Sequence, residues 1–222
     1  MKNKLILFDL DGTLIDTAPD FVSCLNNLLF EHKRDLVDYN TLSPLVSLGT
    51  NKILQTFFPE VAPDTDEFIK LRTQYLNYYA ATAYSESIEF AGIDKLLDSI
   101  EQAGGTWGIV TNKPQRFALP ICESFGYMQK SACLVCGDTL ANAKPHPQPV
   151  QHAMALAGFT ADNCVFIGDA ANDIISGNMA GTKTIAVSYG YIPPEIDLNL
   201  WKADFVANTP DEILNWILQW NQ

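Results

Sequence analysis

Two aspartates stand two positions apart near the start of the chain, directly after an apolar segment. Asp9 and Asp11 belong to the sequence DLDGT at residues 9–13, which follows LILF at residues 5–8. Holding two like charges so close is costly unless a cation joins them, and a divalent metal ion is the usual solution. A carboxylate that is held beside a metal ion and shielded from water is a nucleophile toward phosphorus. The pair therefore predicts phosphoryl chemistry.

Three more polar clusters occur along the chain, each close behind an apolar segment. They are TNKP at residues 111–114, KPHP at 144–147 and GDAAND at 168–173. Together they offer a hydroxyl, an amide, a lysine in a stiff proline-bracketed loop and further carboxylates at the start of a helix. Each cluster alone is weak evidence for a functional site, because such sequences also form ordinary turns and helix caps. Four clusters that all follow strand patterns predict a single polar pocket.

The elements that must position these clusters alternate between strand and helix patterns. Continuous apolar runs, typical of strands covered on both faces, lie at residues 4–10, 106–111, 132–136, 164–167 and 183–187, with a weaker run at 204–207. Helical spacing fills the gaps, and TPDE at 209–212 has the N-cap, proline and glutamate of a helix start. The pattern predicts an α/β fold with a doubly wound, Rossmann-like parallel sheet, which would bring all four clusters to one edge.

Residues 16–87 break this alternation, because they contain three helical patterns and no convincing strand. We expect a small all-helical cap domain inserted after the first strand, over the carboxyl ends of the sheet. The predicted division is residues 1–15 and 88–222 for the core and 16–87 for the cap. The apolar positions of the three patterns are Phe21, Cys24, Leu25, Leu28; Ile53, Leu54, Phe57, Phe58; and Phe68, Leu71, Tyr75, Tyr78.

Composition limits the classes of partner. The 222 residues include 26 acidic and 14 basic side chains, a formal charge of −12, which disfavours nucleic acid and membrane partners. The first apolar segment stops at Asp9, too early for a signal or transmembrane segment, so we expect a cytoplasmic protein. We expect a monomer or a homodimer. Five cysteines indicate reduced thiols, and the CLVC of residues 133–136 is better explained by buried strand thiols than by zinc or redox chemistry.

The four motifs DLDGTLIDT, VTNKP, AKPHPQP and GDAAND, in this order, resemble those of the haloacid dehalogenase superfamily of phosphohydrolases. The likeness extends over essentially the full chain. Within the superfamily the chain is similar to the phosphoglycolate phosphatase group, also through SYGY at 188–191, and to the N-acetylmuramic acid 6-phosphate phosphatases. The resemblance implies Mg²⁺-dependent hydrolysis of a small phosphate monoester through an aspartyl phosphate.

The resemblance also implies a role for each motif residue. Asp9 would be the nucleophile and Asp11 the general acid and base. Lys144 would neutralise Asp9 and the transferring phosphoryl group, to which the Thr111 hydroxyl and the Asn112 backbone would donate hydrogen bonds. The implied Mg²⁺ ligands are an Asp9 oxygen, the Asp11 backbone carbonyl, Asp169 and, directly or through water, Asp173. Asp173 could instead orient Lys144 or a water.

Substrate contacts are expected from the cap and from the second motif. Residues 47–52 would form a loop between the first two cap helices that reaches the active site. The candidate substrate-binding residues are Gly49, Thr50, Lys52, Lys113 and Arg116. Lys52 or Arg116 could pair with a substrate carboxylate or be surface charges, and Lys113 could be exposed.

Other residues near the motifs have simpler explanations. His146 fits a loop residue near the pocket, and Asp16 fits the start of the linker into the cap. Asp138 follows a strand and could support Lys144.

Other activities stay open at this point. A sugar-phosphate mutase would use the same phosphoenzyme but a second hydroxyl as acceptor. A dehalogenase is disfavoured because the related family lacks the second aspartate, and Asp11 is present. A phosphonatase would need a cap lysine, for which Lys33, Lys52 and Lys70 are candidates. A non-catalytic binding module should have lost charged site residues, yet all four clusters are intact.

Overall fold

The computed structural model describes residues 1–82 and 84–220. The chain divides into two compact units. The first consists of Met1–Ile15 and Glu89–Gln222, and the second of Asp16–Ile88. Within the described residues, no helix combines the length and apolar character needed to span a membrane.

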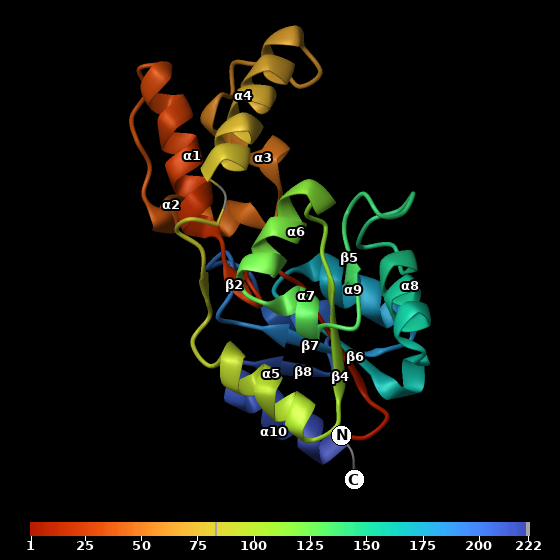
Figure 1. Cartoon of the computed structure of the whole chain (residues 1–222). Helices are drawn as coiled ribbons and strands as arrows, with labels where there is room; N and C mark the ends of the chain where they lie inside the picture. Colours follow the sequence, from red (N-terminus) through yellow and green to blue (C-terminus); the bar gives the residue numbers. More distant parts are fainter. Residues whose placement is uncertain (83, 221–222) are drawn as a thin grey trace. The chain divides into compact units, whose positions relative to one another are not determined.

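The first unit contains a six-stranded parallel sheet with the strand order β5-β4-β1-β6-β7-β8 (Figure 1). The strands are β1 (Leu5–Phe8), β4 (Thr106–Val110), β5 (Leu134–Val135), β6 (Cys164–Gly168), β7 (Lys183–Val187) and β8 (Phe205–Ala207). Helices cover both faces, so the predicted doubly wound α/β fold is confirmed. They are α5 (Ile93–Gln102), α6 (Gln115–Ser124), α7 (Tyr127–Lys130), α8 (Gln148–Ala157), α9 (Ala171–Ala180) and α10 (Pro210–Trp220), with 3₁₀ turns at Ala161–Asn163 and Leu198–Trp201.

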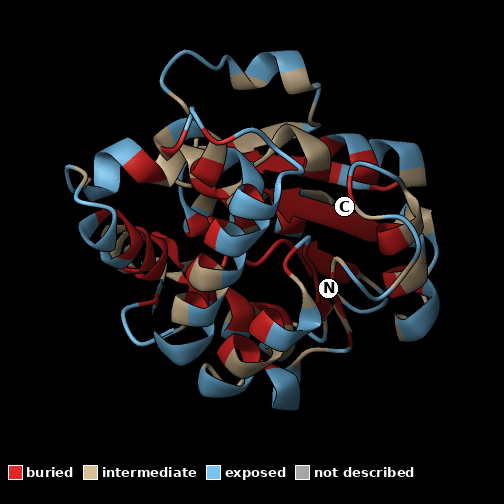
Figure 2. Ribbon diagram, turned by 90° about the horizontal axis from the view of Figure 1, so that it is seen from above, coloured by how far each residue is buried: buried red, intermediate tan, exposed pale blue. Residues whose placement is uncertain are grey.

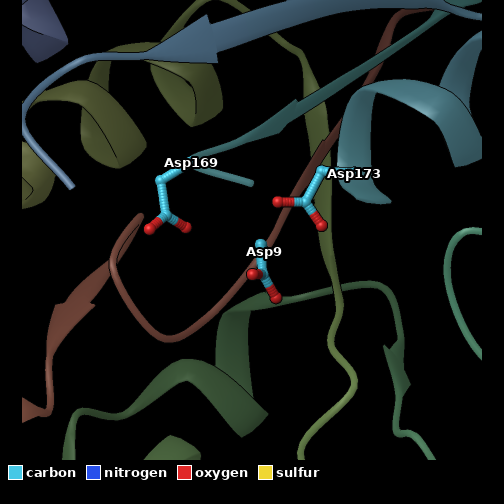
Figure 3. A group of neighbouring side chains, drawn as sticks. All are labelled: Asp9, Asp169 and Asp173. Atoms are coloured by element: carbon cyan, nitrogen blue, oxygen red, sulfur yellow. The ribbon is translucent and has the colours of Figure 1, made fainter. Parts of the chain in front are cut away.

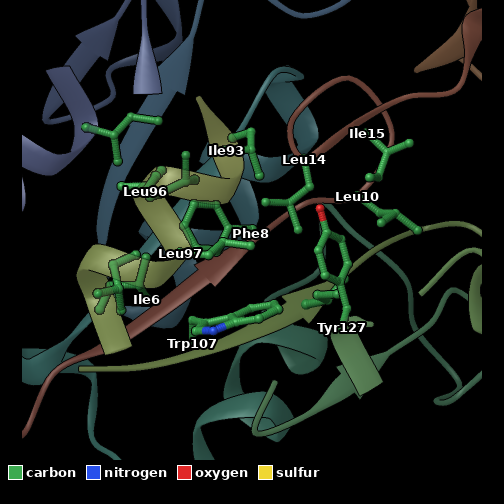
Figure 4. Close-up of a cluster of buried hydrophobic side chains, with 14 of the residues drawn as sticks. Ile6, Phe8, Leu10, Leu14, Ile15, Ile93, Leu96, Leu97, Trp107 and Tyr127 are labelled. Atoms are coloured by element: carbon green, nitrogen blue, oxygen red, sulfur yellow. The ribbon is translucent and has the colours of Figure 1, made fainter. Parts of the chain in front are cut away.

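Strand β1 lies inside the sheet and is buried on both faces. Ile6 and Phe8 pack in a core cluster with residues of α5 (Figure 4) and with Ile213 and Ile217 of α10. Leu5 and Leu7 pack in a second cluster with residues of α8. Burial of all four side chains explains the unbroken apolar run in the sequence. Strands β1 and β6 are buried along their whole length, whereas exposed residues lie on the outer sides of the helices (Figure 2).

The order of the strands reverses around β1, which pairs with β4 on one side and β6 on the other. Crevices at the carboxyl ends of strands beside such a switch point are where open α/β sheets bind ligands. Two ladder hydrogen bonds continue past the strand ends: the Asp9 amide donates to the Ile167 carbonyl (2.8 Å), and the Thr111 amide donates to the Val135 carbonyl (2.9 Å). The first residues of two polar clusters are therefore fixed by the sheet itself.

The second unit is helical, with α1 (Ala18–Glu31), α2 (Tyr39–Val46), α3 (Thr50–Phe57) and α4 (Asp66–Thr82). Helix α2 was not among the three predicted. It buries only Leu42 and Val46 and contains Pro44, so its apolar period is too short to recognise; it begins where Asp38 accepts a hydrogen bond from the Thr41 amide (2.9 Å). Two-residue strands β2 (Ile15–Asp16) and β3 (Ile88–Glu89) pair where the chain passes between the units.

Two smaller expectations have clear outcomes. The stretch 47–52 is not a loop throughout, because Thr50, Asn51 and Lys52 form the first turn of α3. All five cysteines are free and buried, which confirms that the CLVC pair consists of buried thiols.

Candidate functional site

Three carboxylates lie side by side at the carboxyl edge of the sheet (Figure 3). Asp9 follows β1, Asp169 follows β6, and Asp173 belongs to the first turn of α9. One oxygen from each lies within 4.8 Å of the others, and all three residues are buried. Parallel strands explain the convergence, since their carboxyl ends meet at one edge.

Burial and the neighbouring carboxylates disfavour the ionised forms of two of these acids. Burial raises the pKa of Asp9 to about 7 despite the opposing attraction of Lys144, and Asp173 and Asp11 raise it further. Burial together with the charges of Asp9 and Asp173 raises the pKa of Asp169 to about 8. An all-oxygen set of buried carboxylates is the donor type that Mg²⁺ takes in proteins, so these residues fit a divalent hard cation.

Lys144 is buried against two of these acids. Its Nζ lies 2.8 Å from Asp9 Oδ1 and 2.7 Å from Asp173 Oδ1, and it donates to the Val110 carbonyl at 2.8 Å. Burial acts to lower the pKa of Lys144, but Asp173 and Asp9 outweigh it and hold the pKa above its ordinary value. Lys144 is therefore a charged group in the site. Of the two roles considered for Asp173, contact with Lys144 is confirmed and metal contact stays a prediction.

The Asp169 carboxylate is fixed by two hydrogen bonds from neighbouring loops. The Thr13 hydroxyl donates to Oδ1 (3.1 Å), and the Tyr191 amide donates to Oδ2 (2.9 Å). Gly12 has φ +82°, and a Cβ there would lie 2.2 Å from Asp169 Oδ2, so this turn requires glycine. Tyr191 was not predicted as a site residue, although its place after β7, at the same edge of the sheet, could have indicated it.

Asp11 is paired with a lysine of the second motif. Lys113 Nζ lies 2.8 Å from Asp11 Oδ1, and Lys113 is buried. The alternative that Lys113 is exposed is therefore wrong, and its ammonium lies against the Asp11 carboxyl group. A contact between Lys113 and substrate stays a prediction, as does the Asp11 backbone carbonyl as a metal ligand.

Thr111 and Asn112 organise the turn after β4. The buried Thr111 accepts a hydrogen bond from the Lys113 amide at its Oγ1 (3.1 Å). The Asn112 side chain donates to the Lys144 carbonyl and accepts from the Lys144 amide, both at 2.9 Å. Side-chain pairing between Asn112 and the Lys144 backbone was not predicted.

The remaining candidate residues either make local contacts or belong to the second unit. Arg116 is exposed on α6 with its guanidinium carbon 4.5 Å from the Phe117 ring centroid. Asp138 accepts a hydrogen bond from the Gln115 amide (2.8 Å), and His146 Nδ1 accepts from the Gln148 amide (3.1 Å). Gly49, Thr50 and Lys52 belong to the second unit at the start of α3, and their contact with substrate stays a prediction.

Asp16 bonds within its own segment and to α2. It accepts from the Ala18 amide (3.2 Å) and from the Tyr39 hydroxyl (3.1 Å). Both contacts agree with a linker residue.

Comparison with known proteins places these features in context. Residues 6–187 match the family described as haloacid dehalogenase-like hydrolase. The chain is 41% identical over 213 residues to an N-acetylmuramic acid 6-phosphate phosphatase of Pseudomonas putida, covering 96% of this chain and 95% of the relative. It is 38% identical over 207 residues to a phosphoglycolate phosphatase of Xylella fastidiosa, covering 93% and 90%.

Solved structures show the same architecture. A crystal structure described as a predicted phosphoglycolate phosphatase from Haemophilus somnus superposes with a TM-score of 0.86 at 27% identity, covering 98% of this chain and 99% of the other. A predicted phosphatase from Clostridium acetobutylicum has a TM-score of 0.78 at 24% identity, covering 99% and 100%, and supports the fold.

Proposed function

Because this chain belongs to the haloacid dehalogenase-like hydrolase family, we propose that it is a phosphatase that hydrolyses a small phosphate monoester through a phosphorylated Asp9. The observation that carries the proposal is the placement of Asp9 beside Lys144, Asp169 and Asp173 at the sheet edge. Oxygens of the three acids would hold Mg²⁺, together with the Asp11 carbonyl. When bound, Mg²⁺ would neutralise charge on the phosphoryl group and on the acids.

In the first half of the reaction an Asp9 oxygen attacks phosphorus, and the bond between phosphorus and the ester oxygen breaks. The leaving alkoxide takes a proton from Asp11, which acts as the general acid. Lys144 stabilises negative charge on Asp9 and on the phosphoryl oxygens. The Thr111 hydroxyl and the Asn112 backbone amide donate hydrogen bonds to the same oxygens.

In the second half, water attacks the phosphorus of the aspartyl phosphate. Asp11, now ionised, takes a proton from that water, and the bond between phosphorus and the Asp9 oxygen breaks. Inorganic phosphate is released, and the Asp9 carboxylate is regenerated. Lys113 keeps the ionised Asp11 side chain in place through its ion pair (2.8 Å).

The names of the relatives give two candidate substrates, and the relatives named for one of them have the higher sequence identity to this chain. Two relatives at 41% identity are named for N-acetylmuramic acid 6-phosphate, and others at 37% and 38% for phosphoglycolate. We therefore expect a higher kcat/KM with N-acetylmuramic acid 6-phosphate than with 2-phosphoglycolate. The net charge of −12 disfavours nucleic acid as the partner and leaves a small metabolite as the expected one.

The experiment measures phosphate release from p-nitrophenyl phosphate and from both metabolites, with Mg²⁺ and with a chelator. The wild-type protein should release phosphate only with Mg²⁺, and Asp9→Asn should lose at least about 10³-fold in kcat because the nucleophile is gone. Acid-quenched reactions should contain protein-bound phosphate in the wild type and none in Asp9→Asn.

The same experiment tests the mutase alternative. An isomerised sugar phosphate in place of inorganic phosphate would favour a mutase. Absence of turnover with every ester would overturn the proposal of a phosphatase.

A further inference from the structure

Lys144 is held at both of its ends by one short segment at the carboxyl end of β4. The Val110 carbonyl accepts a hydrogen bond from Nζ at 2.8 Å, and two positions later the Asn112 side chain binds the Lys144 backbone. Val110 and Asn112 lie on the same segment, so the ammonium and the main chain of Lys144 are both fixed relative to that segment.

The bond between Asn112 and Lys144 has two points. The Asn112 Nδ2 donates to the Lys144 carbonyl and the Asn112 Oδ1 accepts from the Lys144 amide, each at 2.9 Å, as a paired strand would. Both groups of the side-chain amide are thus used on a single residue 32 positions away. A two-point bond fixes orientation as well as distance, which a single hydrogen bond does not.

A lysine side chain is long and loses much rotamer freedom when it is fixed, so its ammonium is placed well only if its backbone is placed well. The Lys144 Nζ must meet Asp9 Oδ1 and Asp173 Oδ1 together, at 2.8 and 2.7 Å. We propose that the Asn112 side chain is a positioning residue that sets the Lys144 ammonium against Asp9. This inference rests on the proposed function, and it concerns the side chain of Asn112 and not its backbone amide.

The competing explanation is that the two hydrogen bonds between the Asn112 side chain and the Lys144 backbone only join the loops that carry these residues. Asn26 provides a matched control, because its side chain makes the same two hydrogen bonds with the Val37 backbone. Its Nδ2 donates to the Val37 carbonyl (2.9 Å), and its Oδ1 accepts from the Val37 amide (2.8 Å). Asn26 lies in α1 of the second unit. Substitution of either asparagine by alanine removes an equivalent pair of hydrogen bonds and leaves the backbone amide of the mutated residue in place.

The test compares Asn112→Ala and Asn26→Ala with p-nitrophenyl phosphate and Mg²⁺. Misplacement of a catalytic group by about 1 Å costs about 100-fold, so kcat of Asn112→Ala should fall by about that factor, with KM changed by less than about threefold. Asn26→Ala should keep kcat within about twofold, while its melting temperature falls about as far as that of Asn112→Ala. Equal kcat values for the two variants would overturn the inference.

A double-mutant cycle identifies the residue through which Asn112 acts. Against a Lys144→Ala background, Asn112→Ala should lower the residual kcat by less than about threefold, because the positioned group is absent. A full additional loss of kcat in that background would overturn the inference. Should Asn112→Ala fail to fold, the isosteric Asn112→Asp replaces it, with a carboxylate against the Lys144 carbonyl and the same expected loss of kcat.

A crystal structure of the variant keeps this inference separate from the proposed function. Lys144 Nζ should lie out of hydrogen-bond distance of Asp9 Oδ1 or of Asp173 Oδ1 in Asn112→Ala, and should keep both contacts in Asn26→Ala. Unchanged Lys144 contacts would overturn the inference even if the wild type hydrolyses phosphate esters. An inactive wild type would overturn the proposed phosphatase, and the position of Lys144 would still decide the role of Asn112.

Discussion

At the scale of single residues, the acidic cluster depends on positions that have no side chain. Gly168 ends β6, and a Cβ on it would lie 2.2 Å from Asp173 Oδ2. That oxygen accepts a hydrogen bond from the Ala170 amide (3.0 Å), and the other oxygen of Asp173 meets Lys144. A methyl group at residue 168 must therefore displace the Asp173 carboxylate, which contacts Lys144.

We expect Gly168→Ala to lower kcat for p-nitrophenyl phosphate by about 10-fold or more, because the displaced Asp173 releases one partner of Lys144. Gly158→Ala is the control. Gly158 has φ +77°, and a Cβ on it would meet no atom within 4 Å, so its substitution should cost about 1 kcal/mol of stability and leave kcat unchanged. Wild-type kcat in Gly168→Ala would contradict this account of the site.

At the scale of elements, the start of α1 is tied to the segment that returns before β3. Asp20, 1% exposed, accepts hydrogen bonds from the Ser85 hydroxyl (3.3 Å), from the Glu86 amide (3.2 Å) and from the Ser87 hydroxyl. One buried carboxylate thus satisfies donors on a segment 65 to 67 residues away. The entry and exit of the helical unit are held by this contact.

Asp20→Ala should reduce the free energy of unfolding by about 2–3 kcal/mol, because it leaves the buried Ser87 hydroxyl without an acceptor and removes two further hydrogen bonds to a charged group. Urea titration followed by circular dichroism measures the change. Asp38→Ala serves for comparison, since it removes an exposed N-cap that accepts from the Thr41 amide and hydroxyl, and should cost about 1 kcal/mol. If both variants lost the same stability, the Asp20 contact would be no more than an ordinary cap.

Elements with a strong local signal were predictable from the sequence. The run LILF predicted a strand buried on both faces, and the carboxyl ends of parallel strands meet at one edge of a sheet. That reasoning gave the neighbourhood of Asp9, Thr111 and Asp169. Helix α2 lacked such a signal, because it buries two residues and contains a proline.

Contacts between distant side chains were not predictable in the same way. Lys113 and Asp11 are 102 positions apart, and Asn112 and Lys144 are 32 apart. No local pattern distinguishes a lysine that pairs with an acid across the sheet edge from one in solvent. The choice depends on the geometry of the loops, which only the folded chain supplies.

At the scale of the whole molecule, the acidic cluster links stability to pH and to divalent cations. The pKa of Asp9 is raised to about 7 and that of Asp169 to about 8, from an ordinary value of 3.8 in the unfolded chain. Between pH 4 and 8 the folded state therefore binds more protons than the unfolded state, so the free energy of unfolding falls as pH rises through this range. Below pH 4 both states are protonated, and this contribution to the slope disappears.

The metal-free protein should accordingly lose about 5 °C or more in melting temperature between pH 5 and pH 8. Mg²⁺ at constant ionic strength should restore more stability at pH 8 than at pH 5, because carboxylates bind the ion only when they are ionised. Differential scanning calorimetry at both pH values measures the two effects.

Asp169→Asn isolates the cluster from the general repulsion of a chain with a net charge of −12. The substituted amide can still accept from the Tyr191 amide and can donate to the Thr13 hydroxyl, so the loops around it stay bonded. The variant should show a shallower loss of melting temperature with pH and little response to Mg²⁺. A pH slope and a Mg²⁺ response equal to those of the wild type would mean that the coupling arises outside this cluster, because Asp169 is one of the two acids whose raised pKa values produce it.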